Sequence, residues 1–178
     1  MSNATAPLLT LSDFVRDISD FPKPGIIFKD ITPLLSSADA FAQSIRQMAE
    51  PWRGQGIEYI VGIESRGFMF GAAMAQLLGT GFVPVRKPNK LPAQRYEVEY
   101  ALEYGTDKLG IHQDAFVAGS KALIVDDVLA TGGTMRATLQ LAGQLGADVA
   151  GLCFLMELTF LSGRAKLPQI PIHTLIKY

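Results

Sequence analysis

Two stretches of the chain show the same order of a short apolar run, a helical pattern and a second apolar run. The expected strands are 59–63, 82–86, 122–125 and 149–156, and the expected helices are 67–78 and 134–145. The apolar runs lack the alternation of a half-exposed strand, so both of their faces should be buried. This predicts an α/β fold with a parallel sheet flanked by helices, in which ligands bind at the carboxyl ends of the strands.

The N-terminal part has a different pattern. Residues 10–18 place apolar side chains at helical spacing after a possible cap at Thr10, and the sequence PKPG at 22–25 should end that helix and open an extended loop. A second amphipathic helix is expected over 38–50, with Pro51 stopping it. We expect the 178 residues to form one domain, since the chain has no internal repeat or linker.

Composition excludes several classes. The net charge is −1, from 16 Lys and Arg against 17 Asp and Glu, so no global attraction to nucleic acid or an anionic membrane is expected. The single cysteine, Cys153, cannot form a disulfide within the chain, and with His112 and His173 it cannot make a Cys/His zinc site. The N-terminus lacks signal-peptide features, which favours the cytoplasm, and the apolar stretch 67–85 is interpreted as a buried helix and strand.

The sequence DDVLATGGT follows the strand at 122–125 and precedes a helix. Its glycines let successive backbone N–H groups point into one concavity, and the helix N-terminus adds partial positive charge, so the loop can hold a phosphate. The two acids would repel that phosphate unless they bind hydroxyls or face a metal. The alternative is that the acids only complement the helix dipole and the glycines only make a turn; the convergence of phosphate, diol and helix-terminus functions within nine residues favours a site.

This block resembles the phosphoribosyl-diphosphate signature of the type I phosphoribosyltransferases. The resemblance implies that Asp126 and Asp127 bind the ribose hydroxyls. It implies a 5′-phosphate loop made of Ala130, Thr131, Gly132, Gly133 and Thr134.

Five further segments, in order and approximate spacing, are similar to the adenine phosphoribosyltransferase family, from about Phe21 to the C-terminus. They are FPKPGIIFKD at 21–30, ESRGF at 64–68, VRKPNKLP at 85–92, LEYG at 102–105 and MELT at 156–159. The resemblance implies the type I phosphoribosyltransferase fold with a small N-terminal hood, about residues 1–35, over the base site. It also implies a homodimer that converts adenine and 5-phosphoribosyl diphosphate into AMP and pyrophosphate, with Mg²⁺ bound mainly through the substrate and no direct protein ligand assigned.

Displacing the diphosphate from the anomeric carbon needs cations and N–H donors around the leaving group. The resemblance assigns this work to Arg66 and Lys87, which are the expected catalytic cations. It implies a cis peptide at Glu64–Ser65 that turns an N–H toward the diphosphate, and a mobile lid that starts near residue 86 and runs to about residue 100. The full expected diphosphate set is Ser65, Arg66, Arg86, Lys87 and Lys90.

On the base side, Glu103 is the expected catalytic group that takes the purine proton as N9 attacks. Phe28 is expected to stack on adenine, with the backbone at Ile27 reading the base edge and Leu158 packing on the other side. Lys29 departs from the family, in which many members have Arg at this position, and a lysine cannot clamp a diphosphate with two parallel hydrogen bonds.

Two other functions stay open. One is a phosphoribosyltransferase for another base, such as hypoxanthine, xanthine or orotate, which the segment at 21–30 disfavours. The other is a non-catalytic regulator that binds phosphoribosyl diphosphate, which should lack the lid cations and the base; Lys87, Lys90 and Glu103 are present.

Overall fold

The structure is a computed structural model that describes residues 8–101 and 106–178. The chain divides into two compact units, an N-terminal unit that ends at Gln47 and a larger unit, Met48–Tyr178. Whether residues 1–35 form a hood over the base site stays a prediction.

The N-terminal unit contains a β-hairpin followed by two helices. Its elements are η1 (Leu11–Phe14), β1 (Arg16–Ser19), β2 (Ile27–Asp30), α1 (Thr32–Ser36) and α2 (Ala38–Ala49), the last of which continues past the unit's boundary. The second expected helix is confirmed as α2, and Pro51 lies in the short 3₁₀ turn η2 (Glu50–Trp52) that follows it.

The first expected helix, over 10–18, is wrong. Only one 3₁₀ turn forms there, and the chain then continues as β1, which pairs antiparallel with β2. Val15 and Ile18 are β-branched and favour strand backbone once a partner strand is present. The turn between the strands includes a cis Phe21–Pro22 peptide and Gly25 at φ 85°. The segment expected to be an extended loop therefore becomes the second strand of a hairpin.

The larger unit is built on two strand-helix-strand passages, as expected. Its helices and strands are β3 (Tyr59–Ile63), α3 (Gly67–Leu78), β4 (Gly81–Val85), β5 (Arg95–Ala101), β6 (Thr106–His112), β7 (Lys121–Leu129), α4 (Gly133–Gln144), β8 (Asp148–Glu157), η3 (Thr159–Leu161), η4 (Gly163–Lys166) and β9 (Ile172–Lys177). The apolar stretch 67–85 is the helix α3 and the strand β4, and no described helix is long and apolar enough to cross a membrane.

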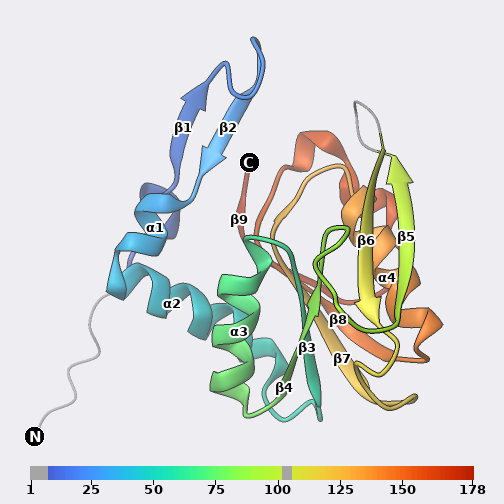
Figure 1. The fold of residues 1–178 in the computed structure, drawn as a ribbon. Coiled ribbons are helices and arrows are strands. Elements are labelled where there is room, and N and C mark those ends of the chain that lie inside the picture. The colour runs from blue at the N-terminus through green and yellow to red at the C-terminus, as the bar shows by residue number, and fades with distance from the viewer. Residues whose placement is uncertain (1–7, 102–105) are drawn as a thin grey trace, which may run out of the picture. The chain divides into compact units, whose positions relative to one another are not determined.

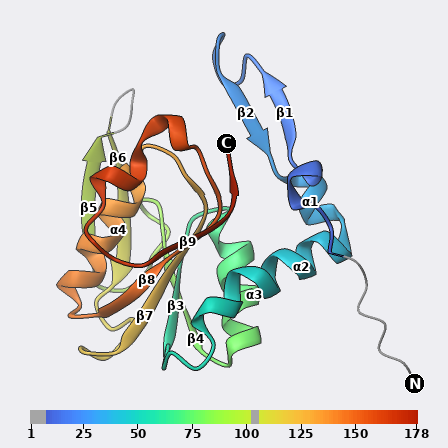
Figure 2. The ribbon, with the colours of Figure 1, turned by 180° about the vertical axis from the view of Figure 1, so that it is seen from behind.

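Five strands form a parallel sheet in the order β4-β3-β7-β8-β9 (Figure 1). Its central strands are buried on both faces. In β3, the side chains of Val61 and Ile63 belong to the same core cluster as residues of α4. Ile60 lies on the other face, where its side chain is close to Gly71 of α3. The view from behind shows α3 beside β3 and β4, away from α4 (Figure 2). The expected parallel sheet flanked by helices is confirmed.

A second hairpin, β5–β6, packs against α4. Val98, Leu109 and Ile111 of the hairpin join Ala137 and Leu141 of α4 in the main core cluster. The interpretation of 86–100 as one long loop is therefore wrong in its second half, where the chain is strand β5. Only the first part, between β4 and β5, lacks regular structure, and one antiparallel bridge joins Arg86 to Gly110 there.

Candidate active site

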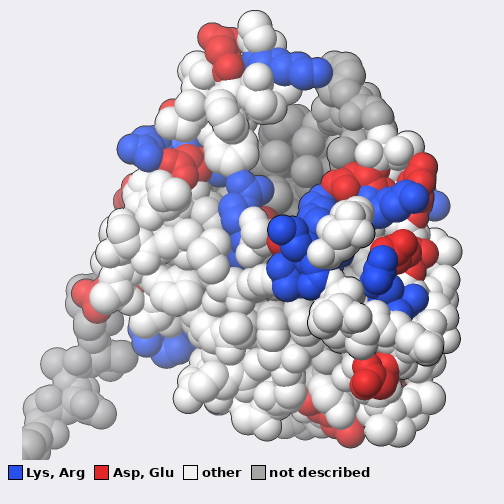
Figure 3. Space-filling view, viewed as in Figure 1, with Lys and Arg blue, Asp and Glu red and all other residues white. Residues whose placement is uncertain are grey.

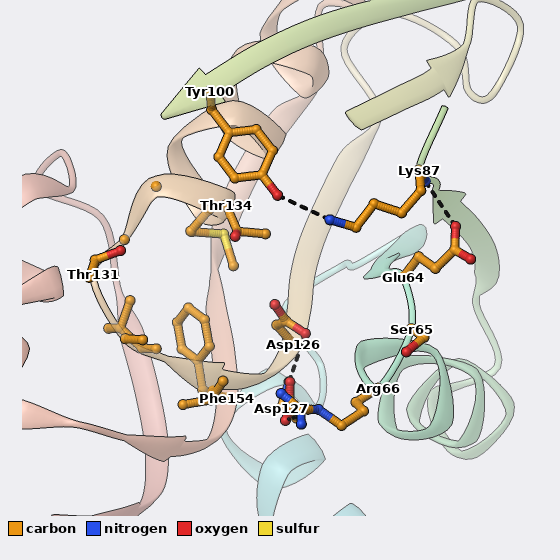
Figure 4. A pocket seen from close by; sticks show the side chains of 16 residues that line it. Glu64, Ser65, Arg66, Lys87, Tyr100, Asp126, Asp127, Thr131, Thr134 and Phe154 are labelled. Atoms are coloured by element: carbon orange, nitrogen blue, oxygen red, sulfur yellow. Dashed lines mark hydrogen bonds and ion pairs between the residues drawn. The ribbon is translucent and has the colours of Figure 1, made fainter. Parts of the chain in front are cut away.

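A cavity of about 440 Å³ opens at the carboxyl ends of β3, β4 and β7. This is the edge at which an α/β sheet binds its ligands. Figure 4 shows side chains from several elements directed toward the same space. The cavity contains most of the residues that the sequence singled out: Ser65, Arg66, Lys87, Asp126, Asp127, Ala130, Thr131, Gly132, Gly133 and Thr134.

One wall of the cavity is the loop between β7 and α4. Strand β7 ends at Leu129 and α4 begins at Gly133, so only three residues make the turn. Gly132 takes φ 83°, a backbone conformation that a residue with a side chain rarely adopts. Thr131 and Thr134 line the cavity beside the helix N-terminus. The unsatisfied N–H groups of that terminus suit a phosphate dianion.

The floor carries the adjacent carboxyl groups of Asp126 and Asp127. Asp126 accepts a hydrogen bond from the backbone N–H of Asp127 at 2.9 Å. Burial raises the pKa of Asp126 well above its usual range, and the neighbouring charge of Asp127 raises it further. Burial also raises the pKa of Asp127, and the Arg66 guanidinium opposes that rise. Burying two carboxyl groups side by side costs free energy, and a ligand with hydroxyl groups, or a cation, would lower that cost.

Arg66, an expected diphosphate ligand, already faces a carboxylate. Its Nε is 2.7 Å from Asp127 Oδ2, and that oxygen is buried with no aligned hydrogen bond among the described residues. Arg66 comes directly after the turn that follows β3, and the Glu64–Ser65 peptide in that turn is cis, as expected. The Arg66 side chain is 38% exposed, so it can reach a ligand as well as Asp127.

Glu64 organises the residues that follow β4. Its Oε2 accepts hydrogen bonds from Arg86 Nε at 3.0 Å and from the backbone N–H of Lys87 at 2.8 Å. The bond from Arg86 lowers the pKa of Glu64. The Arg86 guanidinium also lies 5.5 Å from the centre of the Phe68 ring, a cation–π distance. The Arg86 side chain thus contacts Glu64 and Phe68, and its binding to the diphosphate stays a prediction.

Lys87 connects the cavity to the β5–β6 hairpin. Its ammonium lies 3.4 Å from the hydroxyl of Tyr100 (Figure 4). The same ammonium is paired with Asp107, to which the Tyr100 hydroxyl donates at 3.3 Å. Tyr100 and Asp107 are directly opposite each other in the β5–β6 ladder. Burial alone would lower the pKa of Lys87, but the bonds to Asp107 and Tyr100 outweigh it and raise that pKa. Lys87 is therefore a fixed cation at the cavity.

The remaining expected residues have different surroundings. Lys90 is exposed in the loop after β4, and its charge lowers the pKa of Glu64. Leu158 is partly buried directly after β8, outside the cavity lining. Glu103 lies outside the described residues. Ile27 and Phe28 belong to the N-terminal unit, where Ile27 is exposed and the Phe28 ring meets Phe21 edge-on at 5.2 Å.

Lys29, the departure from the family pattern, forms an ion pair with Asp17 at 2.7 Å across the β1–β2 hairpin. Next to it, Asp30 accepts a hydrogen bond from the backbone N–H of Thr32 and forms an ion pair with Arg16 at 2.5 Å. The Thr32 bond and the Arg16 bond lower the pKa of Asp30 to about 2. These two pairs stabilise the hairpin, and any weaker contact of Lys29 with a diphosphate stays a prediction.

Sequence reasoning assigned no role to six residues that line the cavity: Glu64, Tyr100, Val128, Leu129, Met135 and Phe154. Glu64 directly follows an expected strand, and that position was a usable signal. Tyr100 comes just before the LEYG segment, but only the hairpin register brings it to Lys87. Phe154 lies within an apolar run and is 1% exposed, so the sequence gives no sign that it differs from a core residue.

The surface around this edge carries both charges. Figure 3 shows Lys and Arg side chains gathered over the middle of the drawn face with acidic side chains among them. On the β5–β6 hairpin, Lys108 pairs with Glu99 at 3.3 Å and Arg95 with Glu97 at 2.6 Å. An anionic ligand at this site therefore meets individual cations that already have carboxylate partners.

The parallel α/β sheet, the glycine loop after paired carboxylates and the facing cations define a phosphoribosyltransferase. The model of the phosphoribosyl transferase domain matches residues 29–167. An adenine phosphoribosyltransferase from Acaryochloris marina is 57% identical over 170 residues, which is 96% of this chain and all of that protein. This chain therefore belongs to the adenine phosphoribosyltransferase family.

Solved structures of that family have the same fold. The enzyme from Thermoanaerobacter pseudethanolicus is 53% identical, with a TM-score of 0.91 over 94% of this chain and 98% of that one. The enzyme from Saccharomyces cerevisiae, solved with an imino-altritol bisphosphate and adenine, is 42% identical, with a TM-score of 0.87 over 92% of this chain and 95% of that one.

Proposed function

We propose that this chain transfers the 5-phosphoribosyl group of 5-phosphoribosyl diphosphate to N9 of adenine, giving AMP and pyrophosphate in purine salvage. The observation that carries the proposal is one cavity that joins a phosphate loop at a helix N-terminus, two adjacent carboxyls and the cations Arg66 and Lys87. Family membership and the adenine bound to the yeast relative support the choice of base.

The reaction breaks the bond between the anomeric carbon and the diphosphate oxygen and forms the bond to N9. The electron pair leaves with the diphosphate, whose negative charge grows in the transition state. Arg66 and Lys87 stabilise that charge, together with a backbone N–H of the turn at Ser65. Arg86 and Lys90 are the further proposed diphosphate ligands. Arg66, Lys87 and Arg86 each exchange a carboxylate partner for the leaving group, so they need little movement to act.

The rest of the substrate is held by the β7–α4 region. The 5′-phosphate accepts hydrogen bonds from the N–H groups and hydroxyls of residues 130–134. Asp126 and Asp127 accept hydrogen bonds from the ribose 2′- and 3′-hydroxyls, which supply the donors that two buried carboxylates need. The anomeric carbon is thereby fixed between the loop and the cations, and the positioning itself lowers the barrier.

Adenine must lose a proton when N9 bonds to the sugar. We assign its acceptance to the carboxylate of Glu103, which returns it in the reverse reaction. The base is proposed to stack on Phe28, to be read by the backbone of Ile27 and to pack against Leu158. These assignments rest on the sequence resemblance, and substitution of Glu103 and of Phe28 tests them separately.

The donor set fits Mg²⁺. This ion prefers oxygen ligands and is usually held by one or two carboxylates together with the phosphates of a substrate. Asp126 and Asp127 offer buried carboxylate oxygens, one of them without an aligned hydrogen bond among the described residues. When bound, Mg²⁺ would neutralise charge on the diphosphate, and most of its ligands would be substrate oxygens and water.

The deciding experiment measures AMP formation from adenine, Mg²⁺ and phosphoribosyl diphosphate, with hypoxanthine, guanine and orotate in parallel. Turnover of adenine alone supports the proposal. Turnover of another base in place of adenine would show that the assigned base is wrong. Binding of phosphoribosyl diphosphate without turnover of any base would favour the regulatory protein. Glu103→Gln should lose most of the rate, whereas the control Glu99→Gln, whose carboxylate pairs with Lys108 on the hairpin, should keep it.

We also propose that the chain acts as a homodimer in the cytoplasm, where the thiol of Cys153 would stay reduced. Helix α3 is apolar, and its side chain Met69 is 37% exposed next to exposed Ala72. Such a face suits a self-complementary contact between two copies. Light scattering of the wild type and of Met69→Glu tests it: the proposal expects twice the chain mass for the first and a monomer for the second.

A further inference from the structure

The phosphate loop is supported from outside by the backbone of Gly163, at the start of η4. A Cβ atom on Gly163 would lie 2.1 Å from the carbonyl oxygen of Ala130 and 3.0 Å from the nitrogen of Gly132. In the other direction, a Cβ on Gly132 would lie 2.9 Å from the carbonyl oxygen of Gly163. The two backbones therefore touch glycine to glycine, and any side chain at either position must displace the loop.

The position of Gly163 is fixed by the residue that follows it. Arg164 donates from Nε and Nη2 to the two carboxylate oxygens of Glu157, at 2.9 and 2.6 Å. Glu157 is 5% exposed and is the last residue of β8. A two-pronged arginine–carboxylate pair restricts both distance and orientation. This pair therefore closes the segment 157–164 into a compact turn that holds Gly163 against the loop.

Backbone hydrogen bonds attach the same turn to the sheet. The N–H of Leu158 donates to the carbonyl of Leu129, the last residue of β7 before the phosphate loop, at 2.9 Å. The N–H of Thr159 donates to Tyr178 at 2.9 Å, and the N–H of Tyr178 donates to Glu157 at 3.0 Å. The turn is thus anchored both to the strand that leads into the loop and to the C-terminal end of the chain.

We infer that Gly163 and the Glu157–Arg164 pair are positioning residues for the 5′-phosphate: they set the shape of the loop 130–132 from behind without touching the substrate. The inference rests on the proposed function, in which this loop binds the 5′-phosphate. It makes the connection between β8 and β9 part of the phosphate site, although none of the three residues lines the cavity.

The test compares Gly163→Ala with Gly143→Ala, a glycine of α4 whose added Cβ meets nothing within 4 Å. Ribose 5-phosphate is the probe, because it carries the phosphate without a base and reports on the loop even if the assigned base is wrong. For Gly163→Ala the Kd of ribose 5-phosphate and the KM of phosphoribosyl diphosphate should rise roughly tenfold, as for the loss of about one charge-assisted hydrogen bond. The KM of adenine should stay within about twofold, since the base does not use the loop 130–132 and the one base contact proposed on this turn, Leu158, is held separately by its hydrogen bond to Leu129.

The control Gly143→Ala should leave all three constants at the wild-type values. Folded Gly163→Ala with an unchanged Kd for ribose 5-phosphate would overturn the inference, and so would an equal loss for adenine. If wild type binds ribose 5-phosphate but turns over no base, the proposed function fails while the Kd comparison still decides the positioning role.

A second pair of variants decides the matter if Gly163→Ala does not fold. Arg164→Ala removes the two-pronged bond, and Arg164→Lys keeps the charge with a single point of contact. The Kd of ribose 5-phosphate should be highest for Arg164→Ala and intermediate for Arg164→Lys. The KM of adenine should be unchanged in both variants. Equal Kd values for wild type and both variants would refute the role of the pair.

Discussion

Asp127→Asn should stabilise the substrate-free protein and impair its activity. Asp127 is 3% exposed, and burial raises the pKa of its carboxyl group despite the nearby guanidinium of Arg66. An asparagine has the same shape without the charge, so it removes the cost of keeping an ionised carboxylate out of water. Arg66 loses this carboxylate contact, but at 38% exposure its guanidinium can be hydrated. The substitution thus separates stability from function at a single side chain.

The size of the effect follows from these opposing contributions. Desolvation costs several kcal/mol for a buried ion and the Arg66 contact at 2.7 Å offsets part of it, which leaves a gain of about 1 kcal/mol for asparagine, or about 2–4 °C in Tm. The lost hydrogen bond from a ribose hydroxyl to a charged acceptor should lower kcat/KM for phosphoribosyl diphosphate by about 10- to 100-fold.

The pH dependence of the stability difference provides the strictest check. An acid whose pKa is raised by folding favours the folded state most below its unfolded value, 3.8 for Asp127, and loses that contribution as pH rises through the folded value. The gain of Asp127→Asn in urea unfolding should therefore be present at pH 7 and vanish below pH 3.8. Asp148→Asn, at an exposed aspartate, is the control. A lower stability than wild type at pH 7, or a gain that persists in acid, would refute the reasoning.

Three further results are expected. Asp107→Asn should remove the ion pair with Lys87, lower the pKa of that lysine and cost about 0.5–1 kcal/mol, seen as faster amide hydrogen exchange in β5 and β6; unchanged exchange would contradict it. Glu157→Gln should cost about 1 kcal/mol at pH 7. Because the hydrogen bond from Arg164 lowers the pKa of Glu157, the stability difference between wild type and Glu157→Gln should shrink as pH falls below 4.5. A difference in urea unfolding that stays constant with pH would contradict this prediction. Burial raises the pKa of the Cys153 thiol to about 12, so Ellman's reagent should react with it at pH 8 only after unfolding in guanidinium; rapid reaction of the native protein would show that the thiol is accessible.

The sheet could be predicted because its strands are apolar on both faces and their ends are marked by glycine, proline or charge. Strand β3 and helix α3 match the expected bounds, since Gly67 and Gly79 delimit the helix. Strand β7 extends four residues beyond the expected end at Val125. The acids that follow Val125 had indicated a loop, but a strand can carry carboxyls where its end forms the floor of a cavity.

Two strands escaped prediction for different reasons. Strand β5 carries a usable signal that was overlooked, because Tyr96, Val98 and Tyr100 alternate with charged residues. Strand β1 has no such pattern and exists because β2 pairs with it. The site shows the same limit. Glycine, threonine and acid in DDVLATGGT identify a phosphate loop locally, whereas the contacts of Lys87 with Asp107, 20 residues away, and of Gly163 with Ala130 arise only from the register of strands and turns.

In the proposed reaction, the charge of the cavity lets one site bind an anion and still release it. Among the described lining side chains, the carboxyls of Glu64, Asp126 and Asp127 face the cations of Arg66 and Lys87, so the lining carries no excess of positive charge. Each cation is already paired, and a diphosphate gains only the difference between its own contacts and those that it displaces. The proposed reaction thereby avoids strong ground-state binding, while the growing charge of the departing diphosphate competes better for the same cations. In the same proposal, the backbone N–H groups at the start of α4 change little on binding and hold the ribose phosphate in place. The support of that loop by Gly163 should therefore affect substrate affinity more than the chemistry.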